Sequence, residues 1–364
     1  MTAPAVEATR AAPLLLTGIR NRALTLDEHM NTFGELVRHR DLIQAIARAG
    51  LRGRGGAAFP TAEKLKAVVG QRMTPTVVVN AVEGEPASSK DRALMRLTPH
   101  LVLDGAALAA DAVGADRVVV ALSESARPER HALAQAIRER RGAFEIATVP
   151  ARFVAGEETA LLQAIEGGPA KPTLKPPYPF ERGYLVQNAE TLAQVAIVAR
   201  HGRTTGTALV TLSGAVNRPG VHEIELGGTL ADVVHSLGGT SEPVSAFLVA
   251  GYFGCWVAAR DAATMTLTPD NLGAGVIVAL PTRASGIGET ARIARYLAGE
   301  SAGQCGPCVH GLDAIAGALE SLARGDRAAA SRLTRWTAHV RGRGACRHPD
   351  GAARLVESAL AVFA

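Results

Sequence analysis

The sequence has few aromatic residues and no long apolar run. Phe, Trp and Tyr make up 4% of the 364 residues, and apolar runs such as Val118–Leu122 end at a charge or a glycine. A membrane-spanning helix needs about 20 apolar residues, so we expect no direct membrane insertion. The net charge is +5, but the arginines are scattered among acids and form no basic stripe with aromatic residues between them. We therefore expect no nucleic-acid binding.

Cysteine is also scarce, with four residues in the chain, three of them near the C-terminal end. The first residues contain only a brief leucine-rich patch with an acid ahead of it, which is not typical of a secretory signal. We expect a cytoplasmic protein, in which clustered cysteines indicate metal or redox use before disulfides. With 47% hydrophobic and 20% charged residues, the composition is that of a globular protein.

Hydrophobic periodicity divides the chain into three parts. Up to about residue 200, helical patterns alternate with short apolar runs. They begin with a helix capped by Asp41 and stopped by Gly50, followed by a helix near Thr61 and a strand that runs into an acidic loop. This alternation favours an α/β layer arrangement. From Thr207, short runs separated by Gly and Pro predict a small mixed β unit with one helix, and after Pro281 helical patterns predict a bundle.

A glycine-rich loop, Gly53-Arg54-Gly55-Gly56, lies between the first two predicted helices. Such a loop lets backbone N–H groups approach a phosphate, and the helix that follows adds its positive end. The alternative is a tight turn with no ligand. A dinucleotide-binding Rossmann loop should follow a strand, and here a helix precedes it, so that interpretation fails. Lys64, one turn into the next helix, either adds a charge to the same phosphate or is a surface lysine.

Two acidic loops leave apolar runs. One carries Asn80, Glu83 and Glu85, and the other carries Glu157 and Glu158 after Gly156. Carboxylates at the carboxyl end of a strand can point into a crevice and bind ribityl or ribose hydroxyls. The alternative for the second loop is that its glutamates simply begin a helix.

The cysteines Cys305 and Cys308 form a Cys-x-x-Cys pair, and Cys346 adds a third thiolate. Iron–sulfur clusters and zinc both use such pairs and take about four ligands. The neighbouring His310 and His348 allow a zinc site with three cysteines and one histidine. A cluster, zinc and a plain loop all stay open on spacing alone. The fourth cysteine, in the run GYFGCWVAA, is expected to be a buried structural thiol.

Four segments occur in the order typical of one family: GLRGRGGAAFPT, EGEPASSKDR, GEETALLQAIEG with LKPPYP, and ESAGQCGPC. From about Asp41 to its C-terminal residue, the chain resembles the NADH-binding flavoprotein subunit of respiratory complex I and related subunits of NAD-linked hydrogenases and formate dehydrogenases. The resemblance implies an α/β FMN-binding domain (41–203), a small β-grasp α+β domain of the SLBB type (204–284) and a C-terminal all-α helical bundle carrying an iron–sulfur cluster (285–364). Residues 1–40 form an N-terminal extension.

The resemblance implies that NADH gives a hydride to FMN, which passes electrons singly to the cluster. The expected partner is a ferredoxin-like or other redox subunit, or a membrane redox protein through which the chain lies peripheral to the inner membrane. The competing hypothesis is a non-catalytic scaffold or assembly homologue that has lost a cofactor, with structural zinc or no metal.

The site residues follow position by position from the same resemblance. Glu85 and Glu158 are the candidate catalytic residues and are expected to contact NADH. The other expected NADH contacts are Phe59, Lys175 and Tyr178. The expected FMN ligands are Gly53, Arg54, Gly55, Lys64, Asn80, Glu83, Phe153, Gly156, Glu157, Gln187 and Asn188. The expected cluster ligands are Cys305, Cys308 and Cys346.

The chain departs from the family pattern at several positions. Val82 replaces an aspartate near the flavin, Ala67 replaces an aromatic residue that stacks on adenine, and Ala58 and Ala62 replace glycines. Ala302 stands where the family has its first cluster cysteine. A [4Fe-4S] cluster here needs a fourth ligand from His310, Ser301, water or a partner. Otherwise the site holds a [3Fe-4S] cluster or none.

Overall fold

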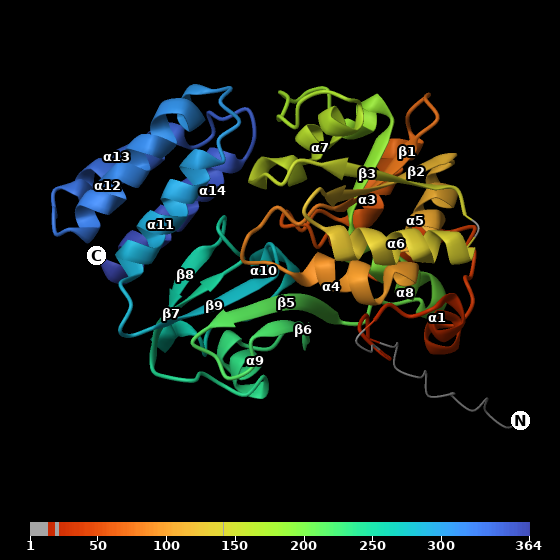
Figure 1. Cartoon of the computed structure of the whole chain (residues 1–364), viewed down its shortest axis with the longest axis horizontal. Coiled ribbons are helices and arrows are strands. Elements are labelled where there is room, and N and C mark those ends of the chain that lie inside the picture. The colour runs from red at the N-terminus through yellow and green to blue at the C-terminus, as the bar shows by residue number, and fades with distance from the viewer. Residues whose placement is uncertain (1–13, 19–21, 141) are drawn as a thin grey trace, which may run out of the picture.

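The computed structural model describes residues 14–18, 22–140 and 142–364. Two sheets and a C-terminal group of helices make up this part of the chain (Figure 1). The first part contains α1 (Leu26–Phe33), α2 (Leu42–Arg48), α3 (Thr61–Val69), β1 (Thr76–Ala81), α4 (Lys90–Leu97), α5 (Pro99–Val113), β2 (Arg117–Ser123), α6 (Arg127–Arg140), β3 (Phe144–Val149), η1 (Phe153–Gly156), α7 (Glu158–Ile165), η2 (Pro179–Arg182), β4 (Tyr184–Asn188) and α8 (Ala189–His201).

The first sheet is parallel, with strand order β3-β2-β1-β4. Val78 of β1 pairs with Val119 and Val186 on its two neighbours. Alternate residues of β1 enter two different cores: Val77 and Val79 pack with α5 and α8, and Val78 packs with α7. A parallel sheet covered on both faces needs apolar side chains on both faces, which explains the unbroken valine run. The carboxyl ends of β1 and β4 therefore lie side by side.

The expected α/β pattern is confirmed, with two local corrections. The acidic loop expected after β1 ends at Lys90, where helix α4 begins. Lys90 and Asp91 are buried and form an ion pair, so they are not exposed to solvent as loop charges would be. Asp41 makes no side-chain capping bond to α2, which ends at Arg48. Gly50 follows with a φ of 62°, the left-handed conformation that stops a helix.

The second sheet is mixed, with strand order β6-β5-β9-β7-β8, and only β5 and β9 are parallel neighbours. One face packs on α9, and the other packs on the C-terminal helices through Trp256, whose Nε1 donates to Thr290 Oγ1 at 2.9 Å. This part contains β5 (Thr207–Gly214), β6 (Gly220–Glu225), α9 (Leu230–Ser236), β7 (Val244–Val249), β8 (Cys255–Ala258), η3 (Ala259–Asp261), α10 (Pro269–Leu272) and β9 (Val276–Pro281).

The C-terminal helices form the predicted bundle and lie at the opposite end of the molecule from α1 (Figure 1). They are α11 (Gly286–Gly299), the π-helical η4 (Pro307–Leu312), α12 (Asp313–Ala323), α13 (Ala329–Val340) and α14 (His348–Phe363). The expected fold class is therefore confirmed, and the exact domain limits remain predictions. In the described part of the chain, no helix is both long and apolar enough to cross a bilayer.

The expected N-terminal extension includes α1, which the sequence patterns did not predict. Its His29 is buried and its Nε2 lies 2.8 Å from Asp104 Oδ2 of α5. Arg140 and Arg200 also pair with Asp104, so α1, α5, α6 and α8 meet at one carboxylate. Burial opposes ionisation, but the hydrogen bond from His29 and the charges of Arg140 and Arg200 lower the pKa of Asp104 to about 2. Residues 1–13 and 19–21 of this region lie outside the described residues.

Candidate functional site

The glycine-rich loop lies against the carboxyl ends of β1 and β4. The Gly53 N–H donates to the Phe59 carbonyl at 2.9 Å, which closes the loop just before α3. A Cβ on Gly55 would lie 3.2 Å from Asn188 Cβ, so the loop backbone approaches the end of β4 closely. Ala58 has a φ of 47°, the left-handed conformation that a glycine adopts without strain. The loop therefore has a defined conformation, and it lies at the carboxyl edge of the sheet, where ligands of parallel sheets bind.

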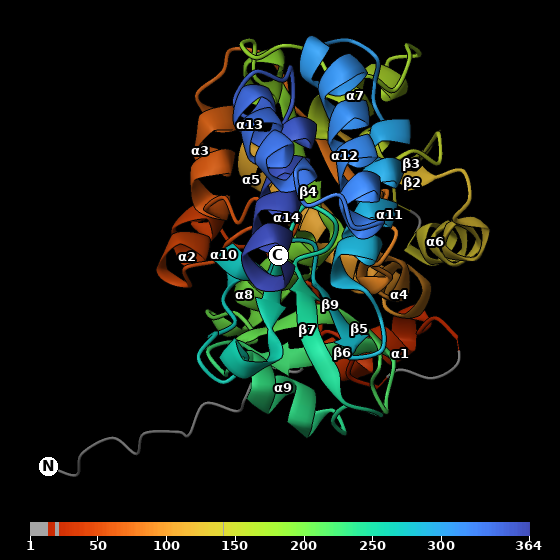
Figure 2. The ribbon, with the colours of Figure 1, turned by 90° about the vertical axis from the view of Figure 1, so that its left-hand side faces the viewer.

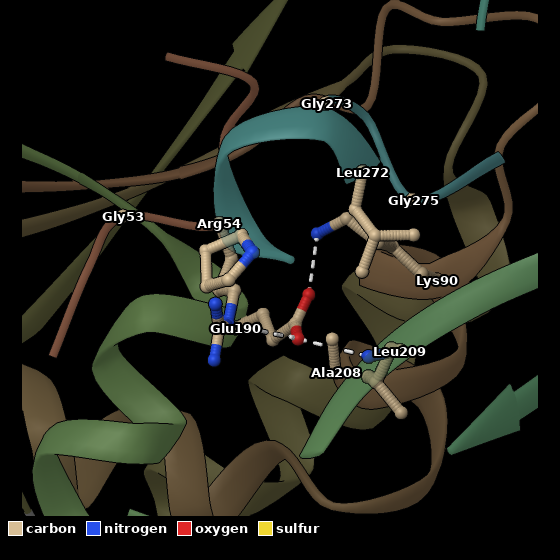
Figure 3. A pocket seen from close by; sticks show the side chains of 10 residues that line it. Gly53, Arg54, Lys90, Glu190, Ala208, Leu209, Leu272, Gly273 and Gly275 are labelled. Atoms are coloured by element: carbon tan, nitrogen blue, oxygen red, sulfur yellow. Dashed lines mark hydrogen bonds and ion pairs between the residues drawn. The ribbon is translucent and has the colours of Figure 1, made fainter. Parts of the chain in front are cut away.

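The Arg54 side chain points away from this edge and into the contact with the second sheet (Figure 3). It is 7% exposed, its Nη2 donates to the Thr207 carbonyl at 3.1 Å, and its Nε lies 3.7 Å from Glu190 Oε1. Lys90 Nζ lies 2.9 Å from the other oxygen of Glu190. The cavity beside these groups has room for about one water molecule. The buried Glu190 carboxylate attracts the guanidinium inward, and Arg54 as an FMN ligand stays a prediction.

The Glu83 carboxylate is likewise already hydrogen-bonded to neighbouring groups of the protein. Its carboxylate accepts N–H bonds from Asp91 at 3.0 Å and Arg92 at 2.9 Å, and an O–H bond from Ser88 at 2.7 Å. It therefore satisfies the first turn of α4. Burial and the neighbouring Asp91 raise the pKa of Glu83. Its φ of 48° is a strained conformation for a residue with a Cβ.

Glu85 bridges the first sheet's loop to the loop after β7. Its Oε2 accepts the Tyr252 N–H at 2.8 Å and its Oε1 accepts the Ala87 N–H at 3.1 Å. A Cβ on Gly251 would lie 2.6 Å from Glu85 Oε2, so only glycine leaves room for this contact. Burial raises the pKa of Glu85 to about 7. The carboxyl can therefore hold or release a proton near neutral pH.

Two lysines and two glutamates converge at the start of α7. Lys64 Nζ lies 3.1 Å from Glu158 Oε2, and Lys175 Nζ lies 2.8 Å from Glu158 Oε1 and 2.9 Å from Glu157 Oε1. Burial opposes ionisation of Glu158, but the two lysines outweigh it and lower its pKa. Glu157 Oε2 also accepts the Thr159 and Ala160 N–H groups, so the helix-start alternative is confirmed for this residue. All four side chains are partly exposed and remain accessible to a ligand.

The amides at the strand ends complete this edge. Asn80 Nδ2 donates to the Gly156 carbonyl at 2.9 Å, and Asn188 Nδ2 donates to Asp91 Oδ2 at 2.6 Å. Gln187 is only 5% exposed, and its Nε2 has no partner among the described residues. A buried amide donor without a partner costs about 1–3 kcal/mol, which a ligand acceptor would offset. Phe59 and Tyr178 are 54% and 44% exposed, and the Tyr178 ring stacks on Phe180 with its centroid 5.6 Å away.

The three predicted cluster cysteines come together. Cys305 and Cys308 flank the start of η4, and Cys346 lies just before α14. The Cys308 N–H donates to the Cys305 carbonyl at 3.1 Å, which closes the turn that carries both thiols. Burial, reinforced by the neighbouring thiols of Cys305 and Cys346, raises the pKa of Cys308 to about 12. Burial also raises the pKa of Cys346. Closely spaced thiols of high pKa release their protons when a metal group binds.

The loop around Phe153 joins the thiols to the carboxylate edge. The Phe153 N–H donates to Glu300 Oε2 at 2.7 Å, and its ring packs edge-on against Phe253 and His348. A Cβ on Gly84 would lie 2.6 Å from the Phe153 carbonyl, so the two loops touch through their backbones. Glu157 and Lys175 both act electrostatically on the Cys346 thiol. Figures 1 and 2 show the bundle beside α7, and the loop around Phe153 links the two candidate sites.

Three family descriptions match consecutive parts of the chain: the Nuo51 FMN-binding domain over residues 46–197, the SLBB domain over 209–250, and the NADH-ubiquinone oxidoreductase-F iron-sulfur binding region over 289–364. The NADH-quinone oxidoreductase F subunit of Aquifex aeolicus is 31% identical over 320 residues, which cover 79% of this chain and 75% of that protein. The chain belongs to this family of NADH-quinone oxidoreductase subunits. This confirms the resemblance, the oxidoreductase class and the expected cofactors, which are FMN, NADH and an iron–sulfur cluster.

Another member of the NADH-quinone oxidoreductase family and a related crystal structure support the same family assignment. A second such F subunit, from Rhizobium meliloti, is 30% identical over 365 residues, covering 89% of this chain and 87% of that protein. The crystal structure of an air-oxidized NAD+-reducing [NiFe]-hydrogenase matches with a TM-score of 0.78 and 30% identity over 89% of this chain. The chain spans 62% of the length of that hydrogenase chain.

The residues at the edge of the first sheet in the present chain fit a phosphorylated flavin. Gly53 and Gly55 keep the loop backbone close, Gln187 has an unpaired buried donor, and Lys64 supplies an accessible positive charge. The three thiols lie within the part of the chain that matches the iron-sulfur binding region. Among the described residues, no three His, Cys, Asp or Glu side chains are grouped so as to hold a single metal ion. His348 Nε2 instead donates to the Leu297 carbonyl at 2.8 Å.

The sequence patterns did not reveal several residues of the site. Lys90, Glu190 and Tyr252 hold Arg54 and Glu85 in place; Lys90 lies within the segment EGEPASSKDR but was given no role, and Glu190 and Tyr252 lie outside the quoted segments. The charged pair Lys90-Asp91 was an available signal, because it follows a small-residue turn at a helix start. Cys255 starts β8, opposite Val249, as expected for a thiol in a strand, but it is only partly buried and not fully buried as expected; its partial burial raises its pKa.

Proposed function

We propose that this chain takes a hydride from NADH onto FMN and passes single electrons to an iron–sulfur group and then to a redox partner. When bound, FMN accepts two electrons together and releases them one at a time. The observation that carries the proposal is the packing of the loop before α7 on the cysteine region. The Phe153 N–H donates to Glu300 Oε2 at 2.7 Å, and the Phe153 ring packs against His348, two residues after Cys346.

Lys64 and the glycine-loop backbone are the residues that we assign to the flavin. In the structure, Lys64 and Lys175 already neutralise Glu157 and Glu158, so an anionic ligand competes with these carboxylates for the lysines. The unpaired Gln187 amide adds a donor at the end of β4. These groups bind and orient a ligand whose phosphate and hydroxyls take the place of the present ion pairs.

Glu85 and Glu158 differ in protonation, which suits different tasks. Glu158 stays ionised because of its two lysines, and it can accept hydrogen bonds from ribose hydroxyls. Glu85 has a pKa of about 7 and can hold a proton beside the ligand or give it up. Phe59 and Tyr178 supply flat, exposed surfaces on which a nicotinamide or adenine ring can stack.

The proposed partner is an acidic redox protein, either ferredoxin-like or a subunit that connects the chain to a membrane. The segment 324–347 carries many arginines against the single acid Asp326, and it ends beside Cys346. Arg335 and Arg343 are exposed and have no ion-pair partner among the described residues. A positive surface next to the electron-donating group steers an acidic protein to it.

The test is spectroscopic, on the purified full-length protein. We expect bound FMN at about one per chain, released on denaturation, and bleaching of its absorbance when NADH is added anaerobically. NADPH serves as the comparison donor. Protein that contains neither flavin nor iron, or that contains stoichiometric zinc at the cysteines, would instead support the scaffold hypothesis.

A further inference from the structure

The loop between β7 and β8 reaches from the second sheet to the carboxylate edge of the first. Glu85 belongs to the loop after β1, and its Oε2 accepts the Tyr252 N–H at 2.8 Å. The two residues are 167 positions apart in the chain. A glutamate side chain has several rotatable bonds, and it keeps one orientation only where its neighbours hold it. The loop after β7 therefore determines where the Glu85 carboxyl lies.

This loop is shaped closely around the carboxyl. Gly251 has a φ of 85°, and a Cβ on it would lie 2.6 Å from Glu85 Oε2 and 2.7 Å from Glu85 Cδ. Ala250 has a φ of 77°, a strained conformation for a residue with a Cβ. On its other side, a Cβ on Gly273 would lie 2.5 Å from Ala250 Cβ. Strain of this kind persists only where the surroundings fix the backbone, so the direction of the Tyr252 N–H is fixed as well.

The Tyr252 side chain is anchored in the C-terminal bundle. Arg292 Nη2 of α11 donates to the Tyr252 hydroxyl at 3.0 Å, and the guanidinium carbon lies 5.8 Å from the centre of the Tyr252 ring. The ring of Tyr296, one turn further along α11, packs edge-on against Tyr252 at 5.6 Å. Tyr252 is buried. One residue thus connects Glu85, the second sheet and the helices that carry the cysteines.

A contact that served only to join the two sheets would not need a carboxyl group. Removing the Glu85 carboxyl from water costs free energy that an apolar side chain would not cost, and it raises the pKa of Glu85 to about 7. The other charged or titratable groups around this contact are Glu83, Tyr252, Tyr296 and Arg292. Carboxyls whose pKa is shifted in this way cluster at functional sites.

We propose that Gly251 and Tyr252 are positioning residues for the reaction with NADH, which hold the Glu85 carboxyl at the place where the nucleotide binds, while Arg292 holds Tyr252. The inference rests on the proposed function, because it requires NADH to bind beside Glu85. The second sheet then takes part in this reaction, since it supplies the amide that orients a residue of the first. Moving the loop should alter the reaction without removing any group assigned to FMN or NADH.

The first test is Gly251→Ala in the full-length protein loaded with FMN. The added methyl group meets the end of the flexible Glu85 side chain, so the carboxyl moves and the backbone does not have to. Gly239→Ala is the matched control, because Gly239 has a φ of 75° and nothing within 4 Å of its Cβ position. We expect anaerobic bleaching of the flavin by NADH to slow by about 10- to 100-fold in Gly251→Ala at unchanged FMN content. Gly239→Ala should keep the wild-type rate.

The anchor in the bundle is tested through Arg292, which leaves the loop sequence intact. Arg292→Met should raise the KM for NADH by about 2- to 10-fold, the value of one hydrogen bond, and Arg292→Lys should recover most of that loss. Arg295→Met is the control, because Arg295 lies on the same helix but pairs with Asp313 and Glu320. This arm answers the question even if Gly251→Ala fails to fold.

A third measurement needs no NADH. Urea unfolding at about pH 5 and about pH 8 reports the proton held by Glu85, because a carboxyl with a raised pKa makes the folded state less stable as the pH rises. Gly251→Ala should weaken this pH dependence, since the displaced carboxyl is better solvated, and Gly239→Ala should keep it.

The outcomes separate the inference from the proposed function. Gly251→Ala protein with the wild-type bleaching rate would overturn the inference, whether or not its unfolding changes, and so would a rate that falls only in proportion to lost FMN. Equal effects of Arg292→Met and Arg295→Met would refute the anchor. Wild-type protein that holds FMN but is not bleached by NADH would refute the proposed function, and the inference with it.

Discussion

The protonation of Glu85 should appear in the stability of the protein. Its carboxyl is buried between the loop after β1 and the loop after β7, and burial raises its pKa from 4.5 to about 7. A proton is bound more tightly in the folded state than in the unfolded state. Between about pH 4.5 and pH 7 the folded state therefore holds the proton and the unfolded state does not, so stability falls as the pH rises.

The magnitude follows from the same values. A rise of the pKa from 4.5 to about 7 corresponds to about 3 kcal/mol, lost progressively across that range and fully lost above it. Glu85→Gln removes the titration. It also changes the hydrogen bonds to Tyr252 and Ala87, but that cost is the same at every pH. The difference in unfolding free energy between pH 5 and pH 8 should therefore shrink by about 3 kcal/mol in the variant.

The assay is urea unfolding at several pH values, followed by the fluorescence of Trp256, which is buried between the second sheet and the bundle. Glu63→Gln is the control, because Glu63 is exposed and pairs only with Lys66 on the same helix. Its pH profile should match that of wild type. If Glu85→Gln also keeps the wild-type slope, the carboxyl titrates as an ordinary glutamate, and the buried bridge to Tyr252 is not formed in solution.

Three further outcomes are expected. Lys64→Met should weaken FMN binding by about 10- to 100-fold in fluorescence titrations, because a charge-assisted hydrogen bond is worth about 1.5–3 kcal/mol. The control Lys66→Met should leave the affinity unchanged. Equal FMN affinities of Lys64→Met and wild type would show that Lys64 does not bind the flavin. Asp104→Asn should lower the unfolding free energy by about 3–5 kcal/mol, because it leaves buried cations unpaired, and a loss below about 1 kcal/mol would contradict that network. The double change Arg335→Glu and Arg343→Glu should slow reduction of an acidic ferredoxin by about tenfold at low salt and much less at ~0.5 M salt, and a salt-independent rate would argue for a different docking face.

Several features of the site were predictable because they are local. The valine run of β1 and the alternating helices specify the parallel sheet through hydrophobic periodicity within a few residues. Glu157 caps α7 through N–H groups two and three residues away, and this alternative was visible in the sequence. The Cys-x-x-Cys pair likewise places two thiols on one turn. Such patterns depend on spacing along the chain, which the sequence states directly.

Other features depended on which distant segments meet. Arg54 has its partner Glu190 more than a hundred residues away, and that pairing directs the guanidinium to the junction of the two sheets. The approach of Cys346 to Cys308 likewise needs the bundle to close.

Sequence alone therefore determined the order of elements, the family motifs and the residue types at the two sites. Tertiary structure decided which charges are neutralised, which carboxyl is buried and which thiols lie near one another. Ion pairs and burial are set by three-dimensional neighbours, and no local pattern encodes them.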